Sequence, residues 1–126
     1  MTPLMYAALN GKLQILEHLL EKGADPSLED NNGWNSLHFA SEGGDPEVID
    51  LLLNHVPNVE SRTAMGVTPL MIATRNGKLT AIKFLLQKGA DPTVEDKMGK
   101  NSLHHASSHD PEVMKLLQSH VANCHT

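Results

Sequence analysis

Cysteine, aromatic residues and long apolar runs are all scarce in this chain of 126 residues. Its single cysteine, Cys124, cannot form an internal disulfide, which excludes the disulfide-rich class of small secreted domains. No uncharged apolar run is long enough to resemble a signal peptide or a membrane span. We therefore expect no membrane insertion and an intracellular protein, cytoplasmic or nuclear. Only 3% of the residues are aromatic, but 40% are hydrophobic, which is enough for a continuous core.

Basic residues are also in the minority, because 10 of them stand against 15 acidic residues and the formal net charge is −5. The field of the whole molecule therefore repels phosphate backbones and anionic lipid. This balance argues against nucleic acid as the partner.

The sequence repeats itself every 33 residues. The repeat is carried by evenly spaced leucines and alanines, namely Leu4, Leu37, Leu70 and Leu103, and Ala7, Ala40, Ala73 and Ala106. A period of this size is typical of stacked supersecondary units, because one unit cannot bury its own apolar face. We expect a single domain over residues 1–126, made of repeats 2–33, 34–66, 67–99 and 100–126.

Each unit has the pattern of a helix, a turn, a second helix and an extended loop. Thr2 and Thr68 precede a proline and can cap a first helix, and Asn35 and Asn101 stand in the same position. Glycines such as Gly11 end this helix after about two turns. The second helix carries leucines on two neighbouring faces, so it is predicted to pack against the units on both sides.

At this point the residues resemble a known family. Thr68-Pro69-Leu70, Ala73, Asn76-Gly77, Leu85-Leu86, Lys88 through Asp91 and Asp96 through Gly99 are similar, in order and spacing, to the ankyrin repeat. The resemblance covers essentially the whole chain. Met5 and Met71 depart from it where the family usually has His. Gly-Ala-Asp is replaced in the second unit by Val56-Pro57-Asn58 and in the fourth by Val121-Ala122-Asn123, and Thr63 replaces the loop Asp. We expect such departures to loosen the hairpins of the second and fourth units.

The resemblance implies an all-α fold with short β-hairpin loops, an ankyrin-repeat solenoid of stacked helix-turn-helix units. It implies a non-catalytic scaffold without cofactors that binds a partner protein on a concave surface of hairpin tips and first helices. Carried over residue by residue, that surface comprises Leu9, Asn10, Asn31, Asn32, Trp34, Glu42, Ala64, Met65, Val67, Arg75, Asn76, Lys97, Met98, Lys100 and Ser108.

Trp34 is the most prominent of these residues, since it lies beside a turn glycine and outside the repeating apolar pattern. It is either an anchor for a partner or a cover for the neighbouring loop. Met65 and Met98 extend the same strip with adaptable side chains, unless they pack one hairpin onto the next. Arg75 can pair with an acidic group of a partner, but a solvated surface charge is the simpler explanation.

Eight histidines invite a search for chemistry. His38 and His104 occupy the family's His position, where the side chain is expected to hydrogen-bond loop backbone. A metal-responsive module can be drawn from a C-terminal group of His105, His109, His120, Cys124 and His125. A zinc site needs four converging ligands, and this spacing does not guarantee them, so we assign no metal ligand. Adjacent Ser and His residues at 107–109 cannot form a hydrolase triad, so we predict that the chain is not an enzyme.

The two ends of the chain differ from its middle. His105 and Gln118 replace apolar residues of earlier units, which predicts a polar terminal cap and an array that ends here. At the other end we expect a fragment of a longer chain, with the outer face of the first unit partly bare. A monomer is expected, while a structural spacer or a segment that self-associates through that face is the alternative. An engineered array is also compatible with such similar repeats.

Overall fold

The computed structural model describes residues 2–55, 58–106 and 111–124. These residues form eight helices: α1 (Pro3–Leu9), α2 (Leu13–Glu21), α3 (Ser36–Gly43), α4 (Pro46–His55), α5 (Pro69–Arg75), α6 (Leu79–Gln87), α7 (Ser102–His105) and α8 (Pro111–Cys124). Helices therefore alternate between a shorter and a longer one along the chain, as the 33-residue pattern predicts.

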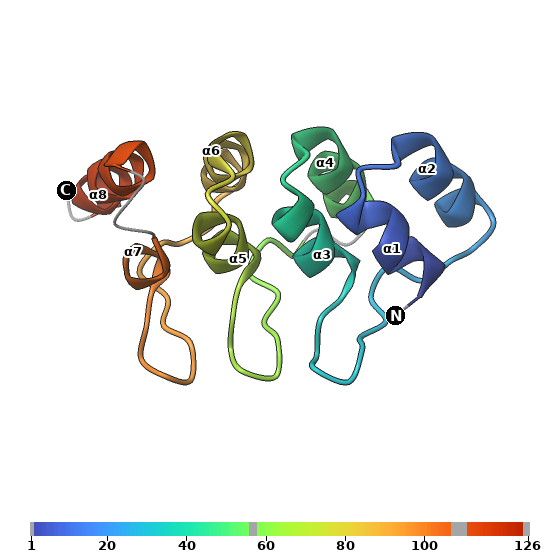
Figure 1. The fold of residues 1–126 in the computed structure, drawn as a ribbon, viewed down its shortest axis with the longest axis horizontal. Coiled ribbons are helices and arrows are strands. Elements are labelled where there is room, and N and C mark those ends of the chain that lie inside the picture. Colours follow the sequence, from blue (N-terminus) through green and yellow to red (C-terminus); the bar gives the residue numbers. More distant parts are fainter. Residues whose placement is uncertain (1, 56–57, 107–110, 125–126) are drawn as a thin grey trace.

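The helices stack in two rows (Figure 1). Helix α1 packs on α3, α3 on α5 and α5 on α7, which makes a row of first helices. Helices α2, α4, α6 and α8 make the second row in the same order. Three long loops project beyond the first row on the side away from the second helices (Figure 1). The predicted solenoid of helix-turn-helix units is confirmed.

The first helices begin where the sequence predicts. The Thr2 Oγ1 accepts a hydrogen bond from the Met5 backbone N–H at 3.2 Å, and Thr68 caps α5 in the same way. The Asn35 side chain accepts bonds from the first free N–H groups of α3, and that of Asn101 accepts one in α7. These caps satisfy donors that a helix start otherwise leaves unpaired.

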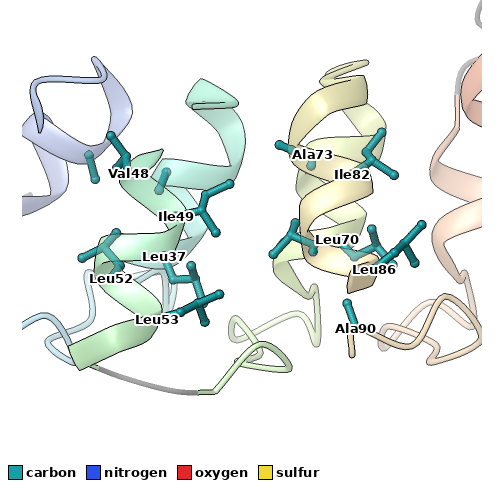
Figure 2. Close-up of a cluster of buried hydrophobic side chains, with 14 of the residues drawn as sticks. Leu37, Val48, Ile49, Leu52, Leu53, Leu70, Ala73, Ile82, Leu86 and Ala90 are labelled. Atoms are coloured by element: carbon teal, nitrogen blue, oxygen red, sulfur yellow. The ribbon is translucent and has the colours of Figure 1, made fainter. Parts of the chain in front are cut away.

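The core runs between the two helix rows and from repeat to repeat. In the middle of the molecule Leu52, Leu70 and Ile82 are almost fully buried, and Figure 2 shows them in the cluster of buried side chains of the second and third units. Because such side chains contact neighbouring units, each unit is held by the next. Truncating one of these leucines to alanine is expected to cost about 2–5 kcal/mol.

The predicted β-hairpins form as turns without strands, since no described residue lies in a β-strand. Each loop is closed by two backbone bonds, which in the first loop run from the Asp30 N–H to the Trp34 carbonyl at 2.9 Å and from the Gly33 N–H to the Asp30 carbonyl at 3.0 Å. At the tips, backbone bonds join neighbouring loops instead. The Ala64 N–H donates to the Asn32 carbonyl at 3.0 Å, and the Lys97 N–H donates to the Met65 carbonyl at 2.9 Å. The expectation of β-hairpins is corrected in this respect, because the backbone groups at the tips bind the adjacent loop.

Thr63 does not open its loop in the way we expected. Its Oγ1 accepts from the N–H groups of Met65 and Val67, both at 3.2 Å. Asp30 and Asp96 accept the same pair of bonds at 2.8–3.0 Å in the flanking loops. The hydroxyl thus reproduces the geometry of the carboxylate with longer bonds to a neutral acceptor, which are weaker than charge-assisted ones.

Candidate partner-binding surface

The residues assigned to partner binding fall into four groups by exposure. Val67 is buried, and Ser108 lies outside the described residues. Three residues are partly buried, namely Leu9, Trp34 and Glu42. The other ten are exposed, namely Asn10, Asn31, Asn32, Ala64, Met65, Arg75, Asn76, Lys97, Met98 and Lys100. We call the thirteen exposed and partly buried residues the loop-and-helix surface.

Val67 does not offer its side chain to a partner. It is 9% exposed and packs with Met71 and Ile72 in a small apolar cluster behind the loops. Sequence position alone placed it on the surface, since the equivalent residues in the neighbouring repeats are Trp34 and Lys100. The cluster that buries it forms only when the repeats stack.

Two methionines stand out at the loop tips. The side chains of Met65 and Met98 are 53% and 68% exposed, and they lie 33 residues apart in the same position of consecutive loops. The second and third loops lie close together: the Lys97 N–H donates to the Met65 carbonyl at 2.9 Å, and a Cβ on Gly66, whose φ is +76°, would lie 3.1 Å from the Lys97 nitrogen. Adjacent tips are therefore rigidly spaced, and both thioethers are accessible.

Trp34 has a packing role. Its ring lies 5.0 Å from the Phe39 ring and 6.0 Å from the His38 ring, both tilted, and it also contacts the cluster of Val67, Met71 and Ile72. The indole is half-buried between two repeats. Its remaining exposed part borders the loop-and-helix surface, so one residue both supports the stack and faces outward.

The ends of the first helices supply the other side of the surface. The Asn10 side chain donates to the Tyr6 carbonyl at 2.9 Å, and Asn76 donates to Ile72 at 2.8 Å, which satisfies carbonyls at the helix ends. Arg75 precedes Asn76 and is exposed, without an ion pair among the described residues. One of the two amide donors of each asparagine is therefore occupied, whereas the guanidinium of Arg75 is available.

His38 links two units, as predicted. Its Nδ1 accepts from the Asn35 N–H at 3.0 Å, so its Nε2 carries the proton and donates to the Ser61 carbonyl at 2.9 Å. Burial lowers the pKa of His38, because the charged form loses solvation. His104 accepts the equivalent local bond from Asn101 but is exposed, and among the described residues no loop lies against its other nitrogen. The predicted hydrogen bond from the His104 side chain to the backbone of a neighbouring loop is therefore not found among the described residues.

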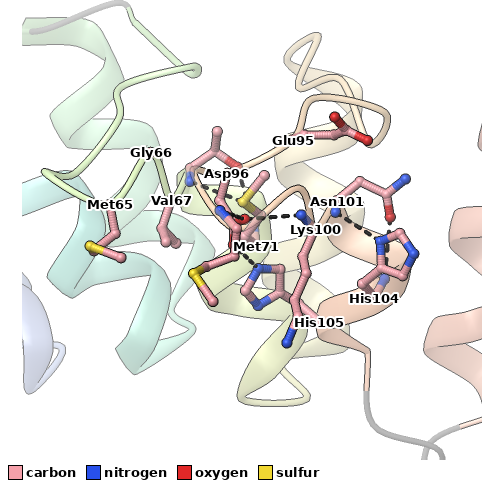
Figure 3. A network of polar contacts seen from close by, with 12 residues as sticks. Met65, Gly66, Val67, Met71, Glu95, Asp96, Lys100, Asn101, His104 and His105 are labelled. Carbon is pink, nitrogen blue, oxygen red and sulfur yellow. Dashed lines mark hydrogen bonds and ion pairs between the residues drawn. The ribbon is translucent and has the colours of Figure 1, made fainter.

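His105 is not part of a solvent-facing cap, contrary to our expectation. Its Nε2 lies 2.9 Å from Asp96 Oδ2, and both side chains are largely buried (Figure 3). The other Asp96 oxygen accepts the N–H groups of Met98 and Lys100, and these bonds, with that of Lys100 foremost, hold the pKa of Asp96 below its usual range. The histidine therefore braces the third loop. Gln118, the other polar replacement, is exposed.

Comparison with known proteins agrees with this architecture. A profile described as ankyrin repeats in three copies matches residues 4–96 and again residues 58–126. The chain belongs to the ankyrin-repeat family.

Similar proteins include inversin from Canis lupus familiaris, which is 34% identical over 125 residues, 97% of this chain and 12% of that protein. Human transient receptor potential cation channel subfamily A member 1 is 33% identical over 118 residues, covering 92% of this chain and 10% of the channel protein. Human BCL-6 corepressor-like protein 1 is 32% identical over 123 residues, 97% of this chain and 7% of its own length. The chain thus spans about a tenth of each of these relatives.

Ankyrin repeats generally mediate protein-protein interaction, and the names of these relatives do not denote enzymes. Within the described part of the ankyrin array, no helix is long and apolar enough to cross a membrane. The described residues also contain no group of three or more His, Cys, Asp or Glu side chains that could hold a metal ion. Of the C-terminal group drawn from the sequence, His109, His125 and the Cys124 side chain lie outside the described residues.

The outer face of the first ankyrin repeat is partly bare, as predicted. Ile15 on α2 is 54% exposed, whereas its counterparts one and two repeats later, Val48 and Ala81, are fully buried. Leu28 is also about half exposed on this end of the array.

Sequence reasoning missed two further exposed residues on the loops and first helices. Tyr6 is 63% exposed on α1 and stands at the position of Phe39, on which Trp34 packs. Arg62 is exposed on the second loop, where its guanidinium donates to the backbone carbonyls of Gly66 and Glu95. The 33-residue register was the signal for Tyr6. No local motif marks Arg62, because its partners lie in two different loops.

Proposed function

We propose that this chain is a non-catalytic, intracellular scaffold that binds a partner protein on the loop-and-helix surface. The observation that carries this proposal is the exposure of Met65 and Met98 on rigidly stacked loops, where neither side chain belongs to the core clusters. Flexible thioethers presented on a preorganised edge suit a surface that buries apolar side chains of a partner. The half-buried indole of Trp34 is adjacent and adds a rigid aromatic boundary.

A crosslinking experiment tests this proposal. A photoreactive amino acid at position 97, between the two methionines in the stacked loops, should crosslink a limited set of proteins in a cell lysate. The double variant Met65→Ala/Met98→Ala should lose these crosslinks and keep its stability, because both side chains are exposed. Leu28→Ala is the matched control, since Leu28 is a similarly exposed apolar residue at the N-terminal end. Partners that are retained by the methionine variant and lost by the leucine variant would contradict the proposal.

A second candidate, self-association, is favoured by the exposure of Ile15 and Leu28. The counterparts of Ile15 in the next two repeats, Val48 and Ala81, are fully buried, and an apolar position that is exposed only at the end of an array tends to mark a contact surface. Sedimentation of the wild type and of Ile15→Glu at high concentration separates the two candidates. An oligomer that dissociates in Ile15→Glu supports self-association, whereas a monomer in both cases leaves the scaffold function alone.

A further inference from the structure

We infer that the segment recognised by the loop-and-helix surface carries carboxylates beside an apolar side chain, and that Lys97, Lys100 and Arg62 pair with them. This inference rests on the proposed scaffold function and specifies the chemistry of its partner.

The first observation is the uneven distribution of charge along the array. Residues 1–61 contain ten acidic and two basic residues, whereas residues 62–126 contain five acidic and eight basic residues. The net negative charge of the molecule therefore conceals a basic C-terminal half.

The second observation is that, among the described residues, the basic groups near the methionines form no ion pair, although Arg62 lies within electrostatic reach of Glu60. Within the described residues the ion pairs join Lys88 to Asp50 and His105 to Asp96. Lys97 and Lys100 are exposed and belong to neither pair. Arg62 bonds to two backbone carbonyls, which orient its guanidinium without neutralising its charge.

The carboxylates of the third loop do not cancel these charges. Asp96 is occupied by His105 and by two backbone N–H groups. Glu95 is exposed, but Figure 3 shows its side chain and that of Lys100 extending to opposite sides of the loop. The Asp96 carboxylate is thus bound within the protein, and neither lysine forms an ion pair with it.

The third observation is that these charges lie beside the apolar side chains. The Lys97 N–H donates to the Met65 carbonyl at 2.9 Å, so the basic tip of the third loop touches the methionine tip of the second. Met98 follows Lys97 directly. A shallow hollow between the two loops is lined by Arg62, Thr63, Gly66, Glu95, Asp96 and Lys97. If an apolar side chain of the partner packs against the Met65 and Met98 thioethers, the residues next to it in the partner's sequence therefore lie within reach of the basic groups.

The inference can be tested by selecting a random dodecapeptide library displayed on phage against the intact chain. Selected peptides should be enriched in Asp and Glu next to an apolar residue. The variant Lys97→Glu/Lys100→Glu should weaken their binding about tenfold, measured as Kd by fluorescence polarisation, since two attractions become repulsions. Added salt should weaken binding to the wild type more than binding to this variant.

The control variant Lys12→Glu/Lys22→Glu changes the net charge by the same amount, at exposed lysines of the first repeat. It should alter the Kd less than twofold if the contact is local. Selected peptides without an acidic excess, an equal loss in both double variants, or a selection without binders that depend on Lys97 and Lys100 would overturn the inference. Peptides that lose binding in Met65→Ala/Met98→Ala but ignore the lysine reversal would leave the scaffold proposal standing and remove only the acidic partner.

Discussion

Replacing Ser36 by proline is expected to stabilise this protein. Ser36 is the first residue of α3, and the repeat pattern has proline at the same position in Pro3 and Pro69. The Ser36 side chain is 1% exposed and its Oγ has no hydrogen-bond partner among the described residues. Pro69 is buried at the equivalent position, so the fold already accommodates a pyrrolidine ring there.

The size of the effect follows from two contributions. Restricting the unfolded chain with a proline that fits the native backbone contributes about 0.4–1 kcal/mol. Removing an unpaired buried hydroxyl avoids a desolvation cost of about 1–3 kcal/mol. Asn35 has φ −105° and ψ −175°, an extended conformation that a following proline allows. Because the two contributions are not fully additive, we expect a gain of about 1–2 kcal/mol in the free energy of unfolding.

Ser102→Pro is the matched comparison. Ser102 is also buried with an unpaired Oγ, but its backbone N–H donates to the Pro92 carbonyl at 3.3 Å. Proline removes this bond, which offsets about 1 kcal/mol of the gain. Urea unfolding followed by circular dichroism should show a higher midpoint for Ser36→Pro, by roughly 0.5–1 M at an unchanged slope, and a smaller change for Ser102→Pro. An equal gain in both, or a loss in Ser36→Pro, would refute the reasoning.

Three further predictions concern single positions. Burial lowers the pKa of His38, so on acidification this histidine is protonated in the unfolded chain before it is protonated in the folded one. Its contribution to the free energy of unfolding is therefore fully present above about pH 6.5 and is lost as the pH falls below that value. In His38→Met this part of the pH dependence of urea midpoints should disappear; an unchanged profile contradicts the prediction. A Cβ on Gly43 would lie 2.4 Å from the Leu9 carbonyl oxygen, so Gly43→Ala should cost at least about 2 kcal/mol in thermal or urea unfolding, and a neutral effect would argue against this close packing. Thr63→Asp should raise the unfolding free energy by up to about 1 kcal/mol above the Asp pKa and lose that gain in acid, and a gain that persists in acid would exclude charge-assisted bonds as its cause.

The caps and the helix order could be predicted because they depend on residues a few positions apart. Thr68 bonds to the N–H three residues later, and Asn35 does the same, whatever lies around them. His38 was also predictable, although its partner Ser61 lies 23 residues away, because the repeat brings each loop back to the same place.

The character of the candidate surface was less predictable. From the sequence, Val67 and Trp34 were equivalent to Lys100, yet the first is buried and the second is half-buried by the same apolar cluster. His105 was expected to face solvent, and instead it bonds to Asp96. In each case the outcome depends on a side chain from another segment.

The sequence by itself therefore determined the period, the helix starts and the stacking of units, since each follows from local bonds and from apolar faces that recur in register. Only the tertiary structure decided which side chains stay accessible and which charges stay unpaired. Exposure and pairing are properties of the space between two loops or two helices, and that space exists only after the units have packed together.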